Sequence, residues 1–195
     1  MGNLRSVQKA FEKIGCNAII SKDSKTILNA TKLVLPGVGS FKDGMKNLKE
    51  LGLIDILNQK VMVDKIPLLG ICLGMQLLSN KSYENGETTG LGWIDAEILK
   101  FKFNFQELKI PHVGWNEISF SENKNLLFHN VENNKDLYFV HSFFFQDNEK
   151  VTIATTNYGF KFTSAINKNN IFATQFHPEK SQTDGLQILK NFWEI

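Results

Sequence analysis

The spacing of apolar residues along the chain predicts an alternation of helices and buried strands. Apolar residues at helical spacing indicate amphipathic helices, whereas short unbroken apolar runs indicate strands buried on both faces of a sheet. Helices are predicted over residues 1–15, 43–58 and 181–193, and strands over residues 17–20, 32–35 and 66–69. Gly52 interrupts the second helix. In the third helix, Ser181 is predicted to be the N-terminal cap, and Trp193 is predicted to face the core. This alternation predicts a parallel sheet with helices on both faces.

The second half of the chain is predicted to be rich in strands. Alternating or aromatic segments that favour strands occupy residues 96–101, 117–120, 137–145, 151–156, 163–167 and 170–176, with a compact loop at residues 111–116. The length of 195 residues suits one α/β domain with a sizeable core, and no linker or repeat divides it. The predicted fold class is therefore α/β, with a mostly parallel sheet in a single domain over residues 1–195.

The composition and charge of the chain argue against several classes of function. The 22 basic and 20 acidic residues nearly cancel, and no basic run invites nucleic acid or an anionic membrane. The two cysteines offer no disulfide framework, and Cys16 is predicted to be a packing residue. The four histidines and two cysteines show no zinc-ligand spacing. With no charged-then-apolar leader and no apolar run of membrane-spanning length, we expect a cytoplasmic protein.

A candidate nucleophile lies where the strand at residues 66–69 turns into a helix. The turn has the sequence Gly70-Ile71-Cys72-Leu73-Gly74. Glycines two residues on either side of Cys72 permit a sharp strand-to-helix turn, because a Cβ at either place would crowd the neighbouring chain. A thiol there sits at a helix N-terminus, which favours the nucleophilic thiolate. A lone cysteine is more often a small buried hydrophobe, so this pattern alone leaves both interpretations open.

A candidate base follows another buried strand about a hundred residues later. The apolar run at residues 171–176 ends in His177-Pro178-Glu179. If the chain stays extended, His177 and Glu179 project to the same side, so that the carboxylate orients an imidazole facing the thiol. The ends of parallel strands lie along one edge of a sheet, where α/β sites are built. Together these residues predict a Cys72-His177-Glu179 triad for nucleophilic catalysis.

The remaining candidates carry weaker signals. The loop at residues 36–41 contains two glycines and can aim backbone N–H groups at an anion, although taken alone it is more often an ordinary turn. His129 is predicted to be a surface residue. His112 and His141 lie in aromatic and glycine-rich surroundings, and two interpretations stand for them: structural residues, or residues lining the mouth of the site.

The motifs resemble a known family. Residues 70–76 and 176–181 resemble the nucleophile and base motifs of class I (triad) glutamine amidotransferases. A narrower resemblance, to the glutaminase subunits of imidazole glycerol phosphate synthases of histidine biosynthesis, covers essentially the whole chain and rests on residues 2–7, 36–39, 111–116 and 138–142. The resemblance implies a flavodoxin-like fold, glutamine as substrate and no cofactor.

The resemblance also implies roles for individual residues. Cys72 attacks the glutamine amide, and His177 protonates the leaving ammonia and then activates water. The oxyanion is held by backbone N–H groups of Leu73, Val38 and Gly39, after a peptide flip in the glycine loop that the partner promotes. The groups implied to hold the α-amino and α-carboxylate groups of glutamine come from Gly39, Gln76, Ser142 and Phe143.

The implied partner is a (β/α)₈-barrel cyclase subunit, which uses the ammonia to make imidazole glycerol phosphate and an aminoimidazole carboxamide ribonucleotide. Asn3, Trp115, Tyr138 and Lys180 match family positions at or near that heterodimer interface. For Trp115 the alternative is core packing.

The chain departs from the family at its start, and other functions remain open. Family members usually open with a short apolar strand that is absent before Met1, so we expect a chain extended upstream to be more stable. The alternatives are a paralogous glutaminase that supplies ammonia to a sugar-modifying partner, an inactive truncated interaction subunit, and a Cys-His peptidase of related fold.

Overall fold

The structure is a computed structural model, which describes residues 3–103, 108–121 and 125–195. Met1 and Gly2, which begin the predicted first helix and the motif at residues 2–7, lie outside the described residues. The helices are α1 (Leu4–Lys13), α2 (Ser24–Leu28), α3 (Phe41–Glu50), α4 (Leu53–Asn58), α5 (Leu73–Leu77) and α6 (Gln182–Glu194), with a π-helical turn at Gln59–Val63 and 3-10 turns at Leu126–Phe128 and Pro178–Lys180. The strands are β1 (Leu33–Gly37), β2 (Leu68–Cys72), β3 (Lys81–Ser82), β4 (Thr88–Thr89), β5 (Ala96–Lys100), β6 (His112–Glu117), β7 (Asp136–His141), β8 (Phe143–Asp147), β9 (Thr152–Tyr158), β10 (Phe160–Lys168) and β11 (Ile171–Thr174).

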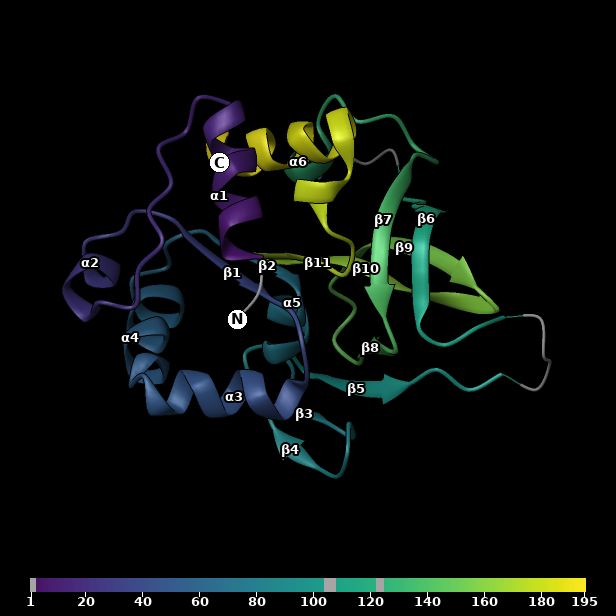
Figure 1. The fold of residues 1–195 in the computed structure, drawn as a ribbon, viewed down its shortest axis with the longest axis horizontal. Helices are drawn as coiled ribbons and strands as arrows, with labels where there is room; N and C mark the ends of the chain where they lie inside the picture. Colours follow the sequence, from purple (N-terminus) through teal and green to yellow (C-terminus); the bar gives the residue numbers. More distant parts are fainter. Residues whose placement is uncertain (1–2, 104–107, 122–124) are drawn as a thin grey trace.

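The described strands form one large mixed sheet and one hairpin (Figure 1). The large sheet has the order β1-β2-β11-β10-β8-β5-β3-β4, and β9 pairs with β10 outside this path. The pairs β1–β2, β2–β11 and β3–β5 are parallel, whereas the strands from β8 to β11 pair in an antiparallel way. The α/β class and the strand-rich second half are thus confirmed, but parallel pairing is less extensive than predicted. Strands β9, β10 and β11 follow one another through short turns, which only antiparallel neighbours permit.

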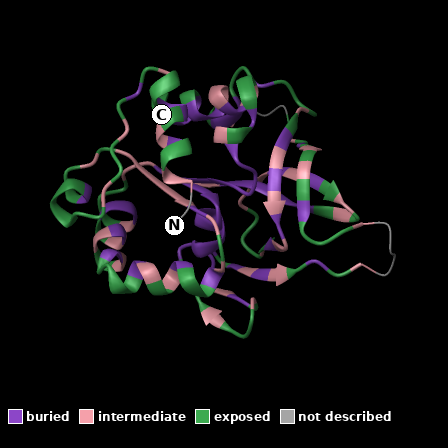
Figure 2. Cartoon of the chain, viewed as in Figure 1, coloured by how far each residue is buried: buried purple, intermediate pink, exposed green. Residues whose placement is uncertain are grey.

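Helices cover both faces of the parallel strands, as the sequence predicts (Figures 1 and 2). Helices α1 and α6 pack on one face, over a core that includes Phe11, Ile71 and Phe192. Helices α3, α4 and α5 pack on the other face, over a core that includes Phe41, Leu68 and Met75. Successive residues of β2 point to opposite faces and are buried on both, which explains why this strand is an unbroken apolar run. Cys16 is buried in the first core, which confirms its packing role.

Two segments differ from their predicted structure. Residues 17–20 are not a strand: no regular element spans them, and the side chain of Ile19 is 73% exposed. Residues 111–116 are not a compact loop, because β6 begins at His112 and pairs with β7 over its whole length. Alternation in β6 buries His112 and exposes Val113 and Trp115, a pattern that the glycine and proline around it obscured. Of the strand predicted at residues 117–120, only Glu117 belongs to β6, and Ser119 forms an isolated bridge with Thr155.

Other predictions compare with the structure as follows. Gly52 interrupts the helix predicted over residues 43–58, as expected: it adopts a left-handed conformation (φ 64°) and separates α3 from α4. Ser181 does not cap α6 with its side chain but accepts from the backbone N–H of Tyr138. Trp193 does not point inward, since it is 44% exposed at the end of α6. The segment predicted as one strand over residues 137–145 is divided between β7 in the hairpin and β8 in the large sheet.

Candidate active site

The turn from β2 into α5 is built around Cys72, as the sequence predicts. Cys72 has positive φ (53°, with ψ −108°), a strained conformation for a residue with a Cβ. Gly74 allows the close approach, because a Cβ there would lie 1.7 Å from the carbonyl oxygen of Leu35 in β1. A Cβ on Gly70 would lie 3.0 Å from the backbone of Gly74. The glycine spacing is therefore a packing requirement of a strained turn that places a thiol at the start of a helix.

The candidate base lies at the end of the neighbouring strand. β11 pairs in parallel with β2, with Thr174 opposite Ile71, so the chain after each strand emerges at the same edge of the sheet. His177 Nδ1 lies 2.7 Å from Glu179 Oε1, and both side chains are buried. The backbone does not stay extended as expected, since Pro178–Lys180 forms a 3-10 turn, but this turn still brings the carboxylate onto the imidazole.

Several contacts fix the position of this imidazole and carboxylate. The backbone N–H of His177 donates to the carbonyl of Tyr138 (2.8 Å), and the Ser181 hydroxyl donates to the carbonyl of His177 (2.7 Å). Asn3, at the start of α1, donates its side-chain amide to Glu179 Oε1. Asn3 was predicted only as an interface residue, and its contact with the carboxylate could not be found from a position so far away in the sequence.

The electrostatics favour a charged imidazole beside the thiol. Burial is the largest single influence and lowers the pKa of His177, but the neighbouring Cys72 and the hydrogen-bonded Glu179 together outweigh it and raise the pKa to about 9. His177 is therefore an imidazolium at neutral pH. Its Nε2 has no hydrogen-bond partner in the described structure, and the thiol of Cys72 is directed at the carbonyl oxygen of Val140 (3.8 Å).

A buried glutamine that sequence reasoning missed contacts the thiol. Gln175 Nε2 lies 3.7 Å from Cys72 Sγ, and the Gln175 side chain is fully buried. Its Oε1 accepts from Gln76 Nε2 (2.9 Å), which also donates to the carbonyl oxygen of Phe143 (3.1 Å). Thus Gln76 and Phe143, two predicted substrate-binding residues, are brought together with Ser142, which precedes β8. The signal in the sequence was the amide of Gln175, which follows Thr174 inside the otherwise apolar run at residues 171–176.

The predicted oxyanion residues lie directly beside the nucleophile. Gly37, at the end of β1, is in register with Cys72, so Val38 and Gly39 follow at the same edge of the sheet. Gly39 is exposed and adopts φ 102°, which favours glycine. Leu73 is the first residue of α5, where a backbone N–H has no partner within the helix. A hollow of about 190 Å³ lies behind this loop, between it and α3 and α5.

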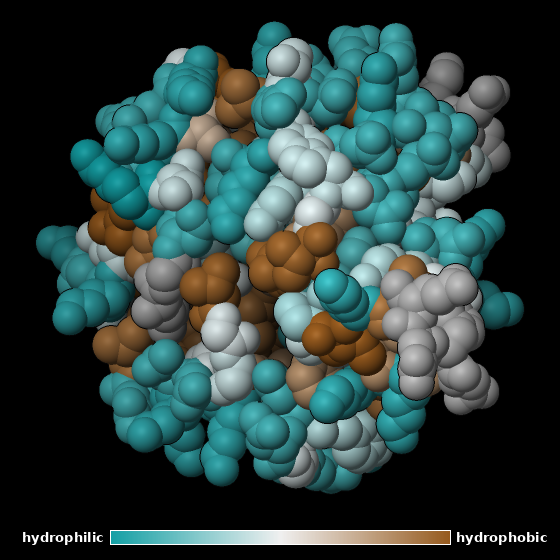
Figure 3. Space-filling view, turned by 45° about the vertical axis from the view of Figure 1, so that its right-hand side comes forward, coloured by the Kyte–Doolittle hydropathy of each residue, from teal (hydrophilic) through white to brown (hydrophobic). Residues whose placement is uncertain are grey.

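The predicted interface residues surround the same edge. Trp115 is 47% exposed and contacts the ring of Tyr138 (centroids 6.0 Å apart), and Lys180 Nζ lies 5.3 Å from the centre of that ring. Core packing of Trp115, the alternative, is therefore wrong. In Figure 3 the side with β6 and β7 is turned forward, and apolar side chains gather near the centre of this face inside a hydrophilic rim. His129, as predicted, is exposed elsewhere.

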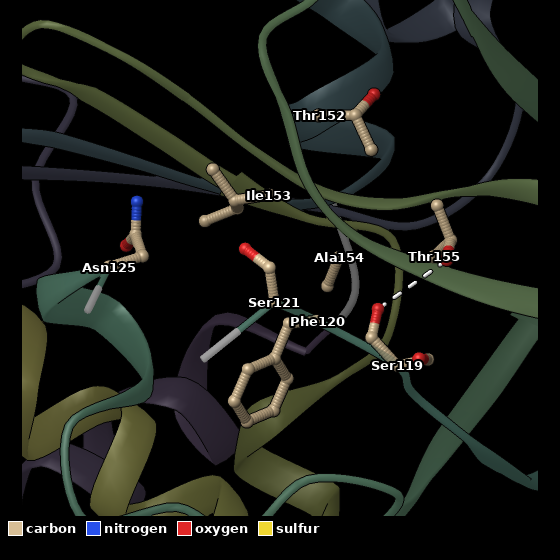
Figure 4. Close-up of a pocket in the computed structure, with 8 residues that line it drawn as sticks. All are labelled: Ser119, Phe120, Ser121, Asn125, Thr152, Ile153, Ala154 and Thr155. Atoms are coloured by element: carbon tan, nitrogen blue, oxygen red, sulfur yellow. Dashed lines mark hydrogen bonds between the residues drawn. The ribbon is translucent and has the colours of Figure 1, made fainter. Parts of the chain in front are cut away.

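A larger hollow, of about 440 Å³, lies away from the triad (Figure 4). It is formed by residues 119–121, Asn125 and the Thr152–Thr155 part of β9, and the Thr155 hydroxyl donates to the Ser119 carbonyl across it. None of Cys72, His177 or Glu179 lines it. Among the described residues no group of three or more His, Cys, Asp or Glu side chains is arranged to hold a metal ion. No helix in the described ranges is long and apolar enough to cross a membrane.

A strand-to-helix turn carrying a cysteine, beside a strand that ends in a histidine and a carboxylate, matches the site plan of one class of protein. The sequence profile of the family described as "Glutamine amidotransferase class-I" matches residues 1–195, and the chain belongs to this family. A solved structure described as a glutamine amidotransferase superposes with a TM-score of 0.74 at 18% identity, covering 99% of this chain and 93% of that one, a likeness of fold.

Curated relatives narrow the comparison. The chain is 52% identical over 191 residues (98% of this chain, 94% of the relative) to "Imidazole glycerol phosphate synthase subunit HisH 1" of Campylobacter jejuni. It is 53% identical over 193 residues, with the same coverage of 98% and 94%, to "Imidazole glycerol phosphate synthase subunit HisH 2" of Methanococcus maripaludis.

Proposed function

We propose that this chain hydrolyses glutamine to glutamate and ammonia with a Cys72-His177-Glu179 triad. The observation that carries the proposal is the 2.7 Å contact between His177 and Glu179, at the end of the strand adjacent to the one that presents Cys72. The raised pKa of His177, to about 9, supports an imidazolium beside the thiol at neutral pH, a proton donor for the leaving group of a Cys-His site.

The reaction follows from these positions in two steps. The Cys72 thiolate attacks the side-chain amide carbon of glutamine, and the charge that develops on the amide oxygen is held by backbone N–H groups at Leu73 and at Val38-Gly39. The His177 imidazolium gives its proton to the leaving nitrogen, and ammonia departs. The neutral imidazole then takes a proton from water, which attacks the thioester and releases glutamate and free thiolate.

We further propose that the ammonia passes to a cyclase subunit, so that the chain acts as the glutaminase subunit of an imidazole glycerol phosphate synthase in histidine biosynthesis. The printed names of relatives about half identical over nearly the whole chain support this role. The exposed Trp115 and Lys180 and the half-buried Tyr138, near the site mouth, support a partner seated over the triad, since Trp and Tyr are enriched at protein interfaces.

The test is ammonia release from glutamine, with and without a cyclase subunit from a related synthase. Wild type and Cys16→Ala should release ammonia, more rapidly with the cyclase, whereas Cys72→Ala should release none. Cys16 is the matched control because it is the second buried thiol of the chain and packs under α1, away from the triad. Activity that survives in Cys72→Ala would end the assignment of the nucleophile.

The partner face has its own test. Trp115→Ala should weaken complex formation with the cyclase, measured by sedimentation or calorimetry, by about tenfold or more, as expected for a buried aromatic anchor. Trp193→Ala is the matched control, because Trp193 is similarly exposed (44% against 47%) but lies at the end of α6. Equal weakening by both variants, or by neither, would show that the partner does not dock over β6 and β7.

A further inference from the structure

The carbonyl oxygen of Phe143 is the fixed point of a chain of buried hydrogen bonds that reaches the nucleophile. A carbonyl oxygen can only accept, so every group that contacts it must donate. Gln76 Nε2 approaches it at 3.1 Å and His141 Nδ1 at 2.8 Å. The orientation of the Gln76 amide and the tautomer of His141 are therefore both set by this one backbone atom.

In one direction, the hydrogen bonds lead from the Phe143 carbonyl to the sulfur of Cys72. The amide nitrogen of Gln76 also faces Gln175 Oε1 (2.9 Å), and Gln175 Nε2 consequently faces Cys72 Sγ (3.7 Å). Turning the Gln175 amide over would set two NH₂ groups against each other and place a carbonyl oxygen against the thiolate. Gln175 is fully buried and Gln76 is 6% exposed, so water cannot hydrogen-bond to the groups in either of these unfavourable contacts.

In the other direction, the hydrogen bonds lead from the Phe143 carbonyl through two histidines to the β6–β7 hairpin. Because His141 Nδ1 carries the proton, its Nε2 accepts, and His112 Nδ1 must donate to it (2.9 Å). His112 Nε2 then accepts from Asn116 Nδ2 (3.1 Å), which also donates to the carbonyl of Asn157. Every donor and acceptor in this run has a defined partner, and the run ends on a second backbone carbonyl.

Both histidines are neutral, which this pattern requires. Burial lowers the pKa of His112 to about 4 and, as the largest influence, lowers that of His141 to about 3. The rings of Phe101, Phe139 and Phe162 pack against the two imidazole rings, with centroids 4.9 to 5.9 Å apart, and exclude water. The sequence left two interpretations of His112 and His141: structural residues, or residues lining the mouth of the site. Their burial favours the structural interpretation, and the hydrogen bonds they make lead to the surroundings of Cys72.

We propose that Gln175 donates a hydrogen bond that holds the Cys72 thiolate, and that His112, His141 and Gln76 are positioning residues that keep the Gln175 amide turned toward the sulfur. The inference deepens the proposed glutaminase, because it names the groups that support the nucleophile. It also links the strand that carries the exposed Trp115, β6, to the sulfur through hydrogen-bonded side chains, since His112 and Asn116 belong to that strand.

The experiment is alkylation of Cys72 by iodoacetamide, followed by mass spectrometry in a Cys16→Ala background between pH 5 and pH 9. Gln175→Met keeps a side chain of similar length without the donor, and the alkylation rate at pH 7 should fall about tenfold, as expected for a hydrogen bond to a charged group. The pH at half-maximal rate should rise by about one unit. Gln175→Glu should react more slowly still, because it puts a carboxylate against the thiolate.

Further variants separate positioning from packing. His141→Phe suits the aromatic surroundings but releases Gln76, and should slow alkylation by less than Gln175→Met because it acts through intermediates. Gln175→Asn keeps the amide but is one methylene too short, and replaces Gln175→Met if that variant does not fold. If Gln175 donates a hydrogen bond to the sulfur, Asn should be tolerated better than Met at this position. If Gln175 only packs, the apolar Met should be tolerated better than Asn.

The outcomes are distinguishable from those of the proposed function, because alkylation uses neither glutamine nor a partner. Wild-type alkylation rates in folded Gln175→Met or Gln175→Asn would overturn the inference, even if ammonia is released normally. The expected order of alkylation rates in a chain that releases no ammonia from glutamine would support the inference and overturn the proposed reaction.

Discussion

Replacing Gly74 with alanine is expected to push the nucleophile turn away from β1. The added Cβ would lie 1.7 Å from the Leu35 carbonyl oxygen and 2.8 Å from its carbonyl carbon, whereas ordinary contacts begin at 3.4 Å. The turn must therefore move by roughly 1.5 Å against a backbone atom that is held in the β1–β2 ladder. Overpacking of this kind typically costs about 1–3 kcal/mol, and an obstacle that is backbone places the change at or above the upper end.

The measurement is urea-induced unfolding followed by circular dichroism, which should show a free energy of unfolding lower by about 3 kcal/mol or more. The matched control is Gly44→Ala in α3, where the Cβ meets the flexible end of Leu77 at 3.1 Å. There the gain in helix propensity, about 1 kcal/mol, offsets the crowding, so we expect little change. If both variants unfold at the same urea concentration, the role assigned to Gly74 is wrong.

The raised pKa of His177 predicts that kcat/KM for glutamine falls as pH rises through about 9, and a profile that stays level to pH 10 would contradict the imidazolium. The same imidazolium stabilises the fold fully below pH 6.5, and this contribution is lost between pH 6.5 and about 9, which unfolding in urea at several pH values would reveal. Asn3→Ala should lower kcat about tenfold by releasing Glu179, and Asn3→Asp should lower it further through charge repulsion; wild-type rates in both would remove Asn3 from the site. Asn191→Ala should lower the free energy of unfolding by about 2–4 kcal/mol, because the buried amide of Asn191 donates to two backbone carbonyls, and a loss below 0.5 kcal/mol would show that these carbonyls find other partners.

The sequence was most informative where one local cause determines the structure. Glycines around Cys72 are required by contacts within a few ångströms, and the His177–Glu179 pair depends on two residues in one turn. The alternation of helices and strands likewise follows from local periodicity, and it is confirmed except at residues 17–20.

Predictions failed where distant parts of the chain decide the outcome. Residues 17–20 have strand propensity, but a strand needs a hydrogen-bonded neighbour, and none pairs with them in the described structure. β6 was hidden because its alternation includes Gly114 and a buried histidine, His112, whose ring nitrogens are satisfied by His141 across the hairpin and by Asn116. The role of Gln175 depends on Gln76, about a hundred residues earlier, so nothing local could reveal it.

The place of β11 in the sheet has a consequence for synthesis of the protein. β11 is the last strand of the described chain, yet it pairs with β2, next to the strand end that carries Cys72. At about 5–20 residues per second, a ribosome needs several seconds to add the hundred or so residues between the thiol and its base. During that interval a nascent chain, or one that terminates early, holds the sulfur without a proton donor. With the triad proposed above, an unfinished chain would lack the base, and hydrolysis of glutamine would begin only after the C-terminal segment has left the ribosome.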